Sequence, residues 1–524
     1  MKMDKGMILQ ISTSRLLVAV FVFAIALPLA GCSSYAYTYA EEYLHIEANN
    51  EEEVKDEEIE TEDLPEGPDE MPAGPDARPQ NAVAISAGSE HTLALMKDGG
   101  LWSWGAGLTF PRNVFSLVGD GTAEDRTRPV KIMEDVVFAV AGPTHSFAIT
   151  EGGTLWAWGA NRYGVLGDGT TEFRFSPVKI MEDVVYATML RDVPNSHAGP
   201  GTQSYAIRSD GSLWAWGCGD VSASYWDFAL GDGGTENLYS PVQILENVRS
   251  VKPTHNGGFA ITNDDVLWHW RGGFWVGSRD ENGEWISTEF ERKPYPVPIM
   301  ENVASISAGF VITTNNELWQ ITNDGPVWIM NDTVYATGFA GTNFAITADG
   351  TLLGWGRNLL PAHWLVRPVL GDGTTVDRDT PVVILEDIAK VRIMGNNTYA
   401  LAKDGILWTW GTGMLSGVPH SLTEYAYHEE EGWTIGKRWL ADDDGGTGIR
   451  LSPVQILNNV TYVAPIYSML NHGWVEVPRA FALTNCGSVW AWGINDRFDW
   501  GLSFLGDGTS EARPYPVRII EGRN

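Results

Sequence analysis

A motif, Leu-Trp-x-Trp-Gly, returns along most of the chain, and this repetition restricts the possible folds more than any other feature. Full or degenerate copies begin at Leu101, Leu155, Leu213, Leu267, Leu318, Leu352, Leu407 and Val489. A second motif, Leu-Gly-Asp-Gly-Thr, is complete at 166–170, 370–374 and 505–509, with variants that begin at Val118 and Leu230. A third, Pro-Val-x-Ile, begins at Pro129, Pro177, Pro241, Pro296, Pro326, Pro381, Pro453 and Pro516. A fixed order of motifs at a period of about 50 residues indicates a repeat architecture.

Each unit can be divided into four short strands, A to D. Strand A is an apolar run such as Val137–Ala141, strand B ends in Ala-Ile-Thr, strand C is the Leu-Trp-x-Trp segment and strand D contains Pro-Val-x-Ile. Pairs such as Asp98-Gly99 between B and C predict two-residue type I′ hairpin turns, in which both central residues need a positive φ. The proline predicts that strand D either begins at that residue or lies on a sheet edge, because proline cannot donate to a ladder.

Four strands and about 50 residues per unit are typical of a β-propeller blade. A single blade cannot bury both of its faces, whereas blades in a ring can, so the repeated tryptophans are predicted to be core residues. We therefore expect an all-β propeller of about eight four-stranded antiparallel blades over residues 81–522. Seven blades plus an irregular unit is the alternative, since the fifth unit, 303–330, is short and lacks Gly-Asp-Gly-Thr.

These units resemble repeats of the regulator of chromosome condensation family. The resemblance rests on Gly-x-x-His before strand B, as at Gly88–His91 and Gly142–His145, together with Leu-Trp-x-Trp-Gly and Leu-Gly-x-Gly-x. It covers about residues 81–522 and implies a propeller, usually of seven blades. His91, His145 and His255 are predicted to share one repeat position, which indicates an architectural role rather than a chemical one.

The N-terminus is typical of an export signal. Basic residues precede an apolar run from Leu16 to Ala30, which ends in Leu29-Ala30-Gly31-Cys32. This resembles the bacterial lipobox, so residues 1–31 are predicted to be a lipoprotein signal peptide and Cys32 the site of lipid attachment; an uncleaved anchor helix is the alternative. Residues 32–80 are acidic and then proline-rich, which predicts a disordered tether. The expected location is a cell membrane, lipid-anchored and outside the cytoplasm.

Charge and motif content exclude several classes of function. The formal net charge of −32 argues against nucleic acid as a partner, because binding to phosphates requires clustered Lys and Arg. The sequence contains no Gly-x-Ser-x-Gly elbow, no Walker loop and no His-x3-His spacing. One Asp in each Gly-Asp-Gly-Thr is too few for calcium, so turn chemistry explains that motif better. We therefore expect no catalytic residues, no metal and no cofactor.

Extra chain length is predicted to collect on one face of the ring. Strands in a blade alternate in direction, so A–B and C–D connections emerge on the same face. The long A–B connections are 190–204 and 464–479, and the long C–D connections are 217–239, 271–294, 357–370, 412–451 and 494–513. Insertions confined to one face of a repeat protein indicate its binding surface.

These connections carry the candidate partner-binding residues, which are aromatic side chains of the kind enriched at interface hot spots. They are Trp226, Phe274, Trp275, Trp285, Trp364, Trp433, Trp439, Trp474 and Trp500. The alternative is that these side chains form small cores inside their own loops. A protein partner at the cell surface is the leading hypothesis, and a glycan or cell-wall ligand is the second. Nucleotide exchange on a small GTPase, which the family resemblance suggests, is the least favoured, because of the export signal and the acidic N-terminus.

Overall fold

A computed structural model of the chain describes most of the repeat region. The described residues are 79–107, 117–189, 203–219, 229–254, 257–272, 274–279, 285–290, 293–322, 325–358, 370–394, 397–412, 425–428, 432–435, 449–470, 475–495 and 504–522. The predicted signal peptide, Cys32 and the tether up to residue 78 lie outside these ranges.

Eight four-stranded antiparallel sheets follow one another along the chain. The first four blades are β1 (Ala82–Ala87), β2 (His91–Met96), β3 (Leu101–Gly105) and β4 (Arg126–Met133); β5 (Val136–Ala141), β6 (His145–Thr150), β7 (Leu155–Gly159) and β8 (Arg174–Met181); β9 (Val184–Met189), β10 (Gln203–Arg208), β11 (Leu213–Gly217) and β12 (Leu238–Leu245); and β13 (Val248–Thr254), β14 (Gly257–Thr262), β15 (Leu267–Arg271) and β18 (Lys293–Met300).

The last four blades have the same plan. They are β19 (Val303–Ser307), β20 (Phe310–Thr313), β21 (Leu318–Thr322) and β22 (Gly325–Met330); β23 (Thr333–Phe339), β24 (Thr342–Thr347), β25 (Leu352–Gly356) and β26 (Arg378–Leu385); β27 (Ile388–Met394), β28 (Asn397–Ala402), β29 (Leu407–Thr412) and β32 (Ile449–Leu457); and β33 (Val460–Leu470), β34 (Val475–Thr484), β35 (Val489–Gly493) and β36 (Arg513–Ile520). Two further hairpins, β16 (Phe274–Arg279) with β17 (Trp285–Phe290) and β30 (Tyr425–His428) with β31 (Gly432–Ile435), form separate two-stranded sheets.

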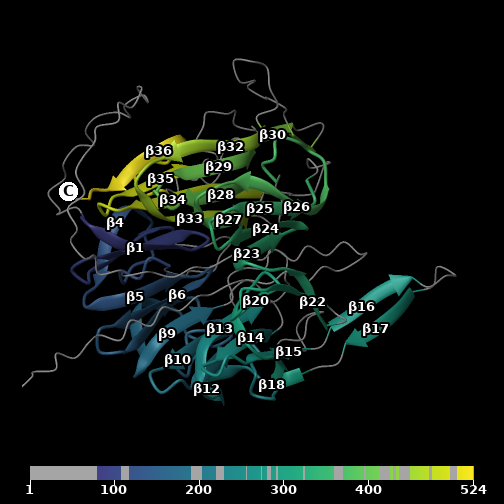
Figure 1. Cartoon of the computed structure of the whole chain (residues 1–524). Coiled ribbons are helices and arrows are strands. Elements are labelled where there is room, and N and C mark those ends of the chain that lie inside the picture. Colours follow the sequence, from purple (N-terminus) through teal and green to yellow (C-terminus); the bar gives the residue numbers. More distant parts are fainter. Residues whose placement is uncertain are drawn as a thin grey trace, which may run out of the picture.

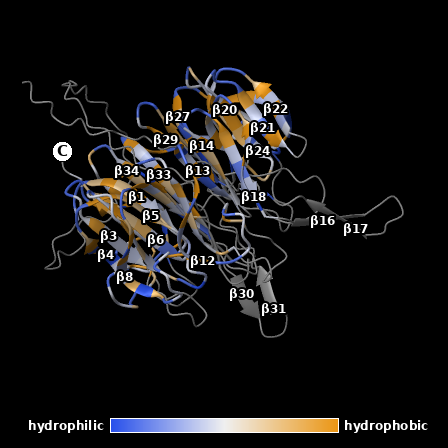
Figure 2. Cartoon of the chain, turned by 90° about the horizontal axis from the view of Figure 1, so that it is seen from below, coloured by the Kyte–Doolittle hydropathy of each residue, from blue (hydrophilic) through white to orange (hydrophobic). Residues whose placement is uncertain are grey.

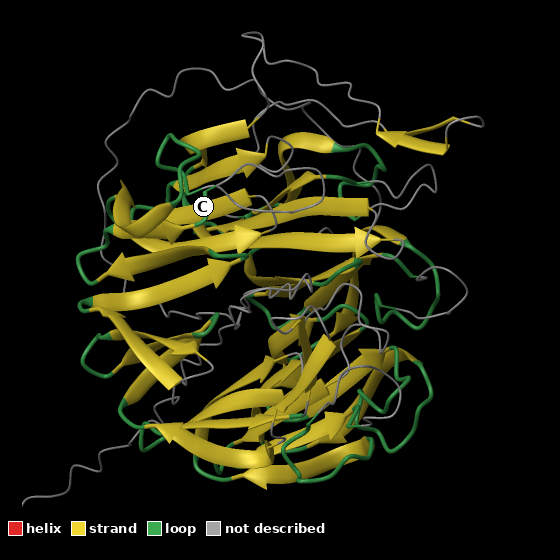
Figure 3. Cartoon of the chain, turned by 90° about the vertical axis from the view of Figure 1, so that its right-hand side faces the viewer, coloured by secondary structure: helices red, strands yellow, loops and turns green. Residues whose placement is uncertain are grey.

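The blades close into a ring (Figure 1). Strands of each blade contact strands of the next, and β1 contacts both β33 and β34, so the last blade meets the first. The eight-blade count is confirmed, and the short unit at 303–330 is a complete blade. The described part of the chain consists of strands and loops (Figure 3), and it contains no helix of a length and apolarity that would cross a membrane.

Strand A is innermost in each blade and strand D is outermost. Inner strands of neighbouring blades contact one another, as β5 does with β1 and β9, whereas D strands such as β4 are partly or fully exposed. The edge position predicted from the proline is therefore confirmed. The alternative, that the strand begins at proline, is wrong, because β4 begins at Arg126, before Pro129. The proline is tolerated because the register shifts between Ser103 and Gly105, so that it faces an irregularity of the ladder.

The B–C hairpins differ from the expected two-residue turns. In the first blade the Met96 N–H donates to the Gly100 carbonyl at 2.9 Å, and the Gly99 N–H donates to the Met96 carbonyl at 3.0 Å. Gly99 has a φ of 82°, but Asp98 does not have a positive φ. The loop is therefore three residues long, with a turn followed by one left-handed residue, which is the arrangement of a type I turn with a G1 bulge. The prediction failed because an Asp-Gly pair satisfies both loop types.

The second tryptophan of the Leu-Trp-x-Trp motifs is buried between two blades, which confirms the prediction that it is a core residue. The same prediction is wrong for the first tryptophan, such as Trp156, which is only partly buried because it lies towards the outside of the blade.

In two blades the indole N–H of this second tryptophan donates to a loop carbonyl of the preceding blade: Trp158 to Leu117 at 3.0 Å and Trp216 to Val165 at 2.7 Å. Trp270 instead donates to the hydroxyl of Tyr205 at 3.3 Å. The Leu-Gly-Asp-Gly-Thr loop of the preceding blade lies directly on the tryptophan ring. A Cβ atom added at Gly167 would lie 2.8 Å from the indole nitrogen of Trp216. Figure 2 shows that apolar residues are concentrated on the strands and hydrophilic residues in the turns.

The ring is closed without a covalent bond. Every other D–A link is continuous, as at Glu134-Asp135, and its second residue is left-handed, with a φ of 56° at Asp135. At the closure Asn81 takes this position with a φ of 59°, and its N–H donates to the Glu521 carbonyl at 3.1 Å. A hydrogen bond thus replaces the peptide bond that links the other blades, so the two ends of the ring meet on the B–C and D–A face.

The loop glycines provide a test of this packing. Gly167 and Gly169 share one loop and nearly the same φ, 82° and 81°, but a Cβ at Gly169 meets nothing nearer than Ser240 Oγ at 3.6 Å. Gly169→Ala should therefore lower the free energy of unfolding only by the strain of a left-handed alanine, about 1–2 kcal/mol. Gly167→Ala should lower the free energy of unfolding by a further ~1–3 kcal/mol, because the new methyl group forces Trp216 to move. Urea unfolding of both variants measures the difference, and equal losses would contradict the packing.

Candidate functional site

The two faces of the ring differ in how much chain they carry. The B–C connections are three-residue loops in all eight blades, and the D–A links on the same face are two residues long. The A–B and C–D connections, on the other face, contain the additional hairpins: β16–β17 lies between β15 and β18, and β30–β31 lies between β29 and β32. In Figure 1 both hairpins lie on the right and the C-terminus on the left. We call the A–B and C–D side the insertion face.

Four of the nine candidate partner-binding residues fall on described strands of this face. Phe274 and Trp275 lie on β16, Trp285 lies on β17 opposite Arg279, and Trp433 lies on β31 opposite Tyr427. The topology places both hairpins at the same end of their blades, but in blades four and seven, which are not neighbours. Trp226, Trp364, Trp439, Trp474 and Trp500 lie outside the described residues, as does Cys32.

The segment 464–479 is mostly regular strand rather than a loop. β33 extends to Leu470 and β34 begins at Val475, and the two strands stay in register as far as the Leu470–Val475 pair. Ladder hydrogen bonding therefore continues beyond the length of other A–B hairpins, and this blade rises above its neighbours on the insertion face. The surplus length was correctly placed, but its secondary structure was missed because the segment contains two prolines and a glycine.

The base of the insertion face is fixed by the aspartate of the Gly-Asp-Gly-Thr loops. Asp168 accepts hydrogen bonds from the Thr170 N–H at 3.0 Å and hydroxyl at 2.8 Å, from Asn161 Nδ2 at 3.0 Å and from Arg174 Nε at 2.7 Å. Burial alone would raise the pKa of Asp168, but the hydrogen bonds from Thr170 and Arg174 outweigh it, and the net pKa is lowered.

The same network surrounds Asp372 and Asp507. Their oxygens are occupied by protein donors, which confirms that the motif is turn chemistry. Within the described residues, no group of three or more His, Cys, Asp or Glu side chains could hold a metal ion.

Two of the three repeated histidines join neighbouring blades. His91 Nε2 lies 2.6 Å from Ser146 Oγ, and His145 Nε2 lies 3.2 Å from Ser204 Oγ, each serine belonging to the next blade. Both rings are buried, and burial lowers the pKa of His145 to about 3. The architectural role is confirmed for this pair. The assignment of His255 to the same position is wrong, because the ladder places Gly257 there, opposite Arg271, just as His91 is opposite Gly105.

A buried arginine takes the histidine position at the closing seam. Arg479 pairs with Gly493, as His91 pairs with Gly105, and its Nη2 donates to the Gly88 carbonyl at 3.2 Å and to the Ser89 carbonyl of the first blade. Its guanidinium also lies 4.6 Å from the centre of the Phe504 ring. Burial lowers the pKa of Arg479 to about 10, so the side chain stays charged at neutral pH and donates across the seam. No motif marks this residue in the sequence, because the arginine replaces the histidine of the repeat.

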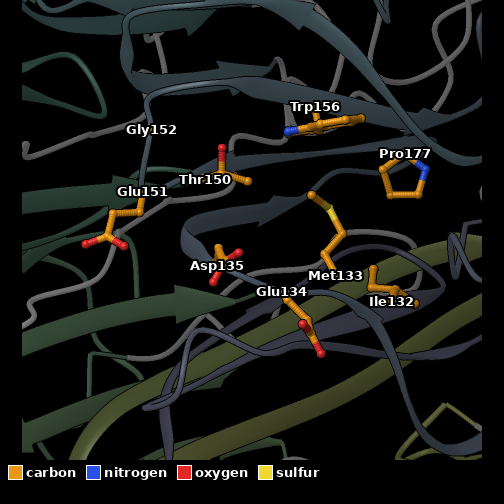
Figure 4. A pocket seen from close by; sticks show the side chains of 9 residues that line it. All are labelled: Ile132, Met133, Glu134, Asp135, Thr150, Glu151, Gly152, Trp156 and Pro177. Atoms are coloured by element: carbon orange, nitrogen blue, oxygen red, sulfur yellow. The ribbon is translucent and has the colours of Figure 1, made fainter.

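A further concave feature lies on the opposite face and was missed from the sequence. A cavity of about 700 Å³ opens between the first and second blades, with Glu134, Asp135 and Glu151 at its acidic side and Trp156 in its wall (Figure 4). The acidic pair after strand D was visible in the sequence. Its position beside Trp156 depends on how the two blades meet.

Comparison with known proteins identifies the repeated unit. Family models described as "Regulator of chromosome condensation (RCC1) repeat" match residues 82–107 and 136–165, and residues 152–189. The matches begin at the first strand of the first blade and, apart from a gap at 108–135, continue to the end of β9, the first strand of the third blade. They agree with the motifs from which the repeat was inferred.

Several eukaryotic relatives carry similar sequence. The human E3 ubiquitin-protein ligase HERC2 is 29% identical over 197 residues, 36% of this chain, which spans only 4% of the ligase. The mitochondrial RCC1 domain-containing protein RUG3 of Arabidopsis thaliana is 25% identical over 357 residues, 64% of this chain and 67% of that protein. Among solved structures, Prp20p from Saccharomyces cerevisiae has 19% identity and a TM-score of 0.44, over 78% of this chain and 83% of that chain.

The buried histidine predicts an acid-sensitive stability. The folded pKa of His145, about 3, lies below the unfolded value of about 6.5, so its contribution is complete above pH 6.5 and is lost as the pH falls towards 3. Between pH 7 and pH 5 this loss is about 2 kcal/mol. Gln203 occupies the same position in the third blade, so His145→Gln should keep the fold and remove this part of the loss. Urea unfolding at both pH values measures it; an unchanged pH dependence would contradict the assignment.

Proposed function

We propose that this chain, whose blades are regulator of chromosome condensation repeats, is a lipid-anchored extracytoplasmic module that binds a protein partner on its insertion face. It acts by binding rather than by catalysis. The observation that carries the proposal is the asymmetry of the ring: the additional hairpins and the lengthened β33–β34 pair emerge on one face, and the other face keeps minimal loops. Rigid scaffolds commonly carry binding residues on such connections.

The hairpins β16–β17 and β30–β31 supply the binding residues in this proposal. Tryptophan and arginine are enriched at interface hot spots, and β16–β17 carries Trp275, Trp285 and Arg279 on adjacent strands. Both hairpins stand on blades whose inner strands are fixed by neighbours on each side, so the hairpin bases are held by a rigid ring. Two protrusions separated by two blades suit a folded protein partner that spans the interval.

The proposed anchor fits the direction in which the chain enters the ring. Gln80 forms a bridge with Glu521 on the face opposite the insertions. A tether from Cys32 that joins the ring at this point leaves the insertion face unobstructed and directed away from the membrane. Two acyl chains at Cys32 would give stable attachment, since each buried methylene contributes about 0.8 kcal/mol.

The anchoring proposal predicts the behaviour of one substitution. In a bacterial host that processes lipoproteins, Cys32→Ser should block lipid attachment, because serine has no thiol to acylate. The variant should then carry no acyl chains to anchor it. Metabolic labelling with a radioactive or clickable fatty acid should label the unaltered chain and leave the variant unlabelled. Equal labelling of both chains would contradict lipid attachment at Cys32.

The partner-binding proposal is tested by substitutions on the two hairpins. The variant Trp275→Ala/Trp285→Ala/Trp433→Ala should lower partner recovery from membrane extract at least about tenfold, because hot-spot tryptophans contribute ~2 kcal/mol or more. Trp328→Ala is the matched control, since this tryptophan is 48% exposed on β22 at the outer rim, away from the insertion face.

Quantitative mass spectrometry of cross-linked material compares these chains. Equal recovery with the triple variant would contradict the proposal. If the unaltered chain recovers glycans rather than protein, and the triple variant does not, the insertion face binds a carbohydrate ligand instead.

A further inference from the structure

The cavity between the first two blades is formed by the face opposite the insertions. It lies where the D–A link of the first blade passes the B–C hairpin of the second. Besides the three carboxylates named above, its lining includes Met133, Thr150, Trp156 and Pro177. Figure 4 shows the carboxyl side chains on one side and the side chains of Met133, Trp156 and Pro177 on the other. We call this feature the acidic groove.

At the next seam of the ring, the space equivalent to the acidic groove is filled by an arginine side chain of the chain itself. Between the second and third blades, Arg208 occupies the equivalent space. Its Nη2 donates to Asp183 Oδ2 at 2.6 Å and its Nε donates to the Glu182 carbonyl at 3.2 Å. Its Cζ lies 5.9 Å from the centre of the Trp214 ring. The chain therefore contains its own example of a guanidinium held by an aspartate, a link carbonyl and a tryptophan.

The ladder registers show that the two seams are equivalent position by position. Ile207 pairs with Leu213 and Ile149 pairs with Leu155, so Thr150 takes the place of Arg208. By the same registers Trp156 corresponds to Trp214. The left-handed link residues Asp135 and Asp183 also correspond, with φ values of 56° and 60°. The acidic groove thus has the same acceptors and ring as the next seam, with a threonine in place of the arginine.

The charge balance of the groove also differs from that of other seams. Glu151 donates its backbone N–H to the Asp135 carbonyl, and the residues that make this contact in the sixth-to-seventh and closing seams are Lys403 and Lys97. A lysine there adds positive charge beside the link, whereas Glu151 adds a third carboxylate. Lys131 Nζ contacts Glu134 Oε1 at 2.9 Å on the exposed side of the groove. Excess negative charge beside an aromatic wall complements a cation with an aliphatic stem.

We propose that the acidic groove binds the side chain of an arginine presented by a segment of a partner protein. The guanidinium pairs with Asp135 and lies over Trp156, as Arg208 does with Asp183 and Trp214, and the aliphatic stem packs against Met133 and Pro177. Arginine suits the groove better than lysine, because its planar group stacks on an aromatic ring and donates along two directions at once. This site lies on the opposite face from the proposed partner-binding hairpins and does not depend on them.

The test uses the full chain labelled with 5-fluorotryptophan and the capped peptide acetyl-Gly-Arg-Gly-amide. Titration at about 0.15 M salt, where long-range attraction is screened, should shift the fluorine resonance of Trp156 saturably. Trp156→Phe identifies that resonance. The lysine peptide should bind several-fold more weakly. No shift at Trp156, or equal affinity for the two peptides, would overturn the proposal.

Two reciprocal variants give the sharpest result. Thr150→Arg should fill the groove with the chain's own arginine and weaken peptide binding at least about tenfold, a change of about 1.4 kcal/mol. Arg208→Thr should open the equivalent space at the next seam, so that the Trp214 resonance also responds and two peptides bind per chain. Unaltered affinity in the first variant, or a silent Trp214 in the second, would contradict the assignment.

Further controls separate folding and ligand source from binding. Thermal unfolding should show that Thr150→Arg remains folded, and Asp135→Asn, which changes no volume, should weaken the peptide severalfold in its own right. Acetyl-arginine-amide alone should bind more weakly than the peptide. Equal affinity for this small ligand would overturn the assignment of the groove to a protein segment.

Discussion

At five described seams of the ring, a tryptophan of one blade contacts a glycine loop of the blade before it, and this contact determines how those blades stack. A single blade has two apolar faces and is stable only when both are covered. The second tryptophan of each motif fills this interface, and the loop approaches closely because Gly167 and its equivalents have no Cβ and adopt a positive φ. The fourth blade has β16–β17 in place of this loop, and the fifth blade has Ile321 in place of the tryptophan. Loop and tryptophan are thus both absent at this seam. At the next seam the sequence again lacks the glycine loop, and Trp355 of the sixth blade packs against Phe310 of the fifth instead.

Polar contacts across the seams explain why the blades sit in one register. Apolar packing is non-directional, whereas His91 and His145 each point a nitrogen at a serine of the following blade. The polar contacts matter more at the closing seam, because no peptide bond links Glu521 to Asn81 there. Arg479 supplies donors for two backbone carbonyls of the first blade, and its charge is buried within the seam. Such a group is costly to leave unpaired, so it favours the fully closed ring.

The two faces of the ring are suited to different kinds of contact. The insertion face grows by adding hairpins to C–D and A–B connections, which leave the blade ladders unchanged. The opposite face cannot grow in the same way, because its three-residue hairpins and its links hydrogen-bond to one another: the Val136 N–H donates to the Gly99 carbonyl at 2.9 Å and the Glu151 N–H to the Asp135 carbonyl at 2.8 Å. Differences between seams on this face are therefore confined to side chains, as with Thr150 and Arg208.

The sequence alone determined the number of blades, the order of strands within each blade, the buried tryptophans and the face on which surplus length emerges. These features follow from motifs repeated at a constant period and from the alternation of strand direction. Only the tertiary structure decided the three-residue form of the B–C loops, the displacement of His255 by Gly257, the closing role of Arg479 and the acidic groove. The reason is physical: these features depend on residues that meet across a seam, about one whole repeat apart or at opposite ends of the chain, and no local pattern specifies which side chain fills that space.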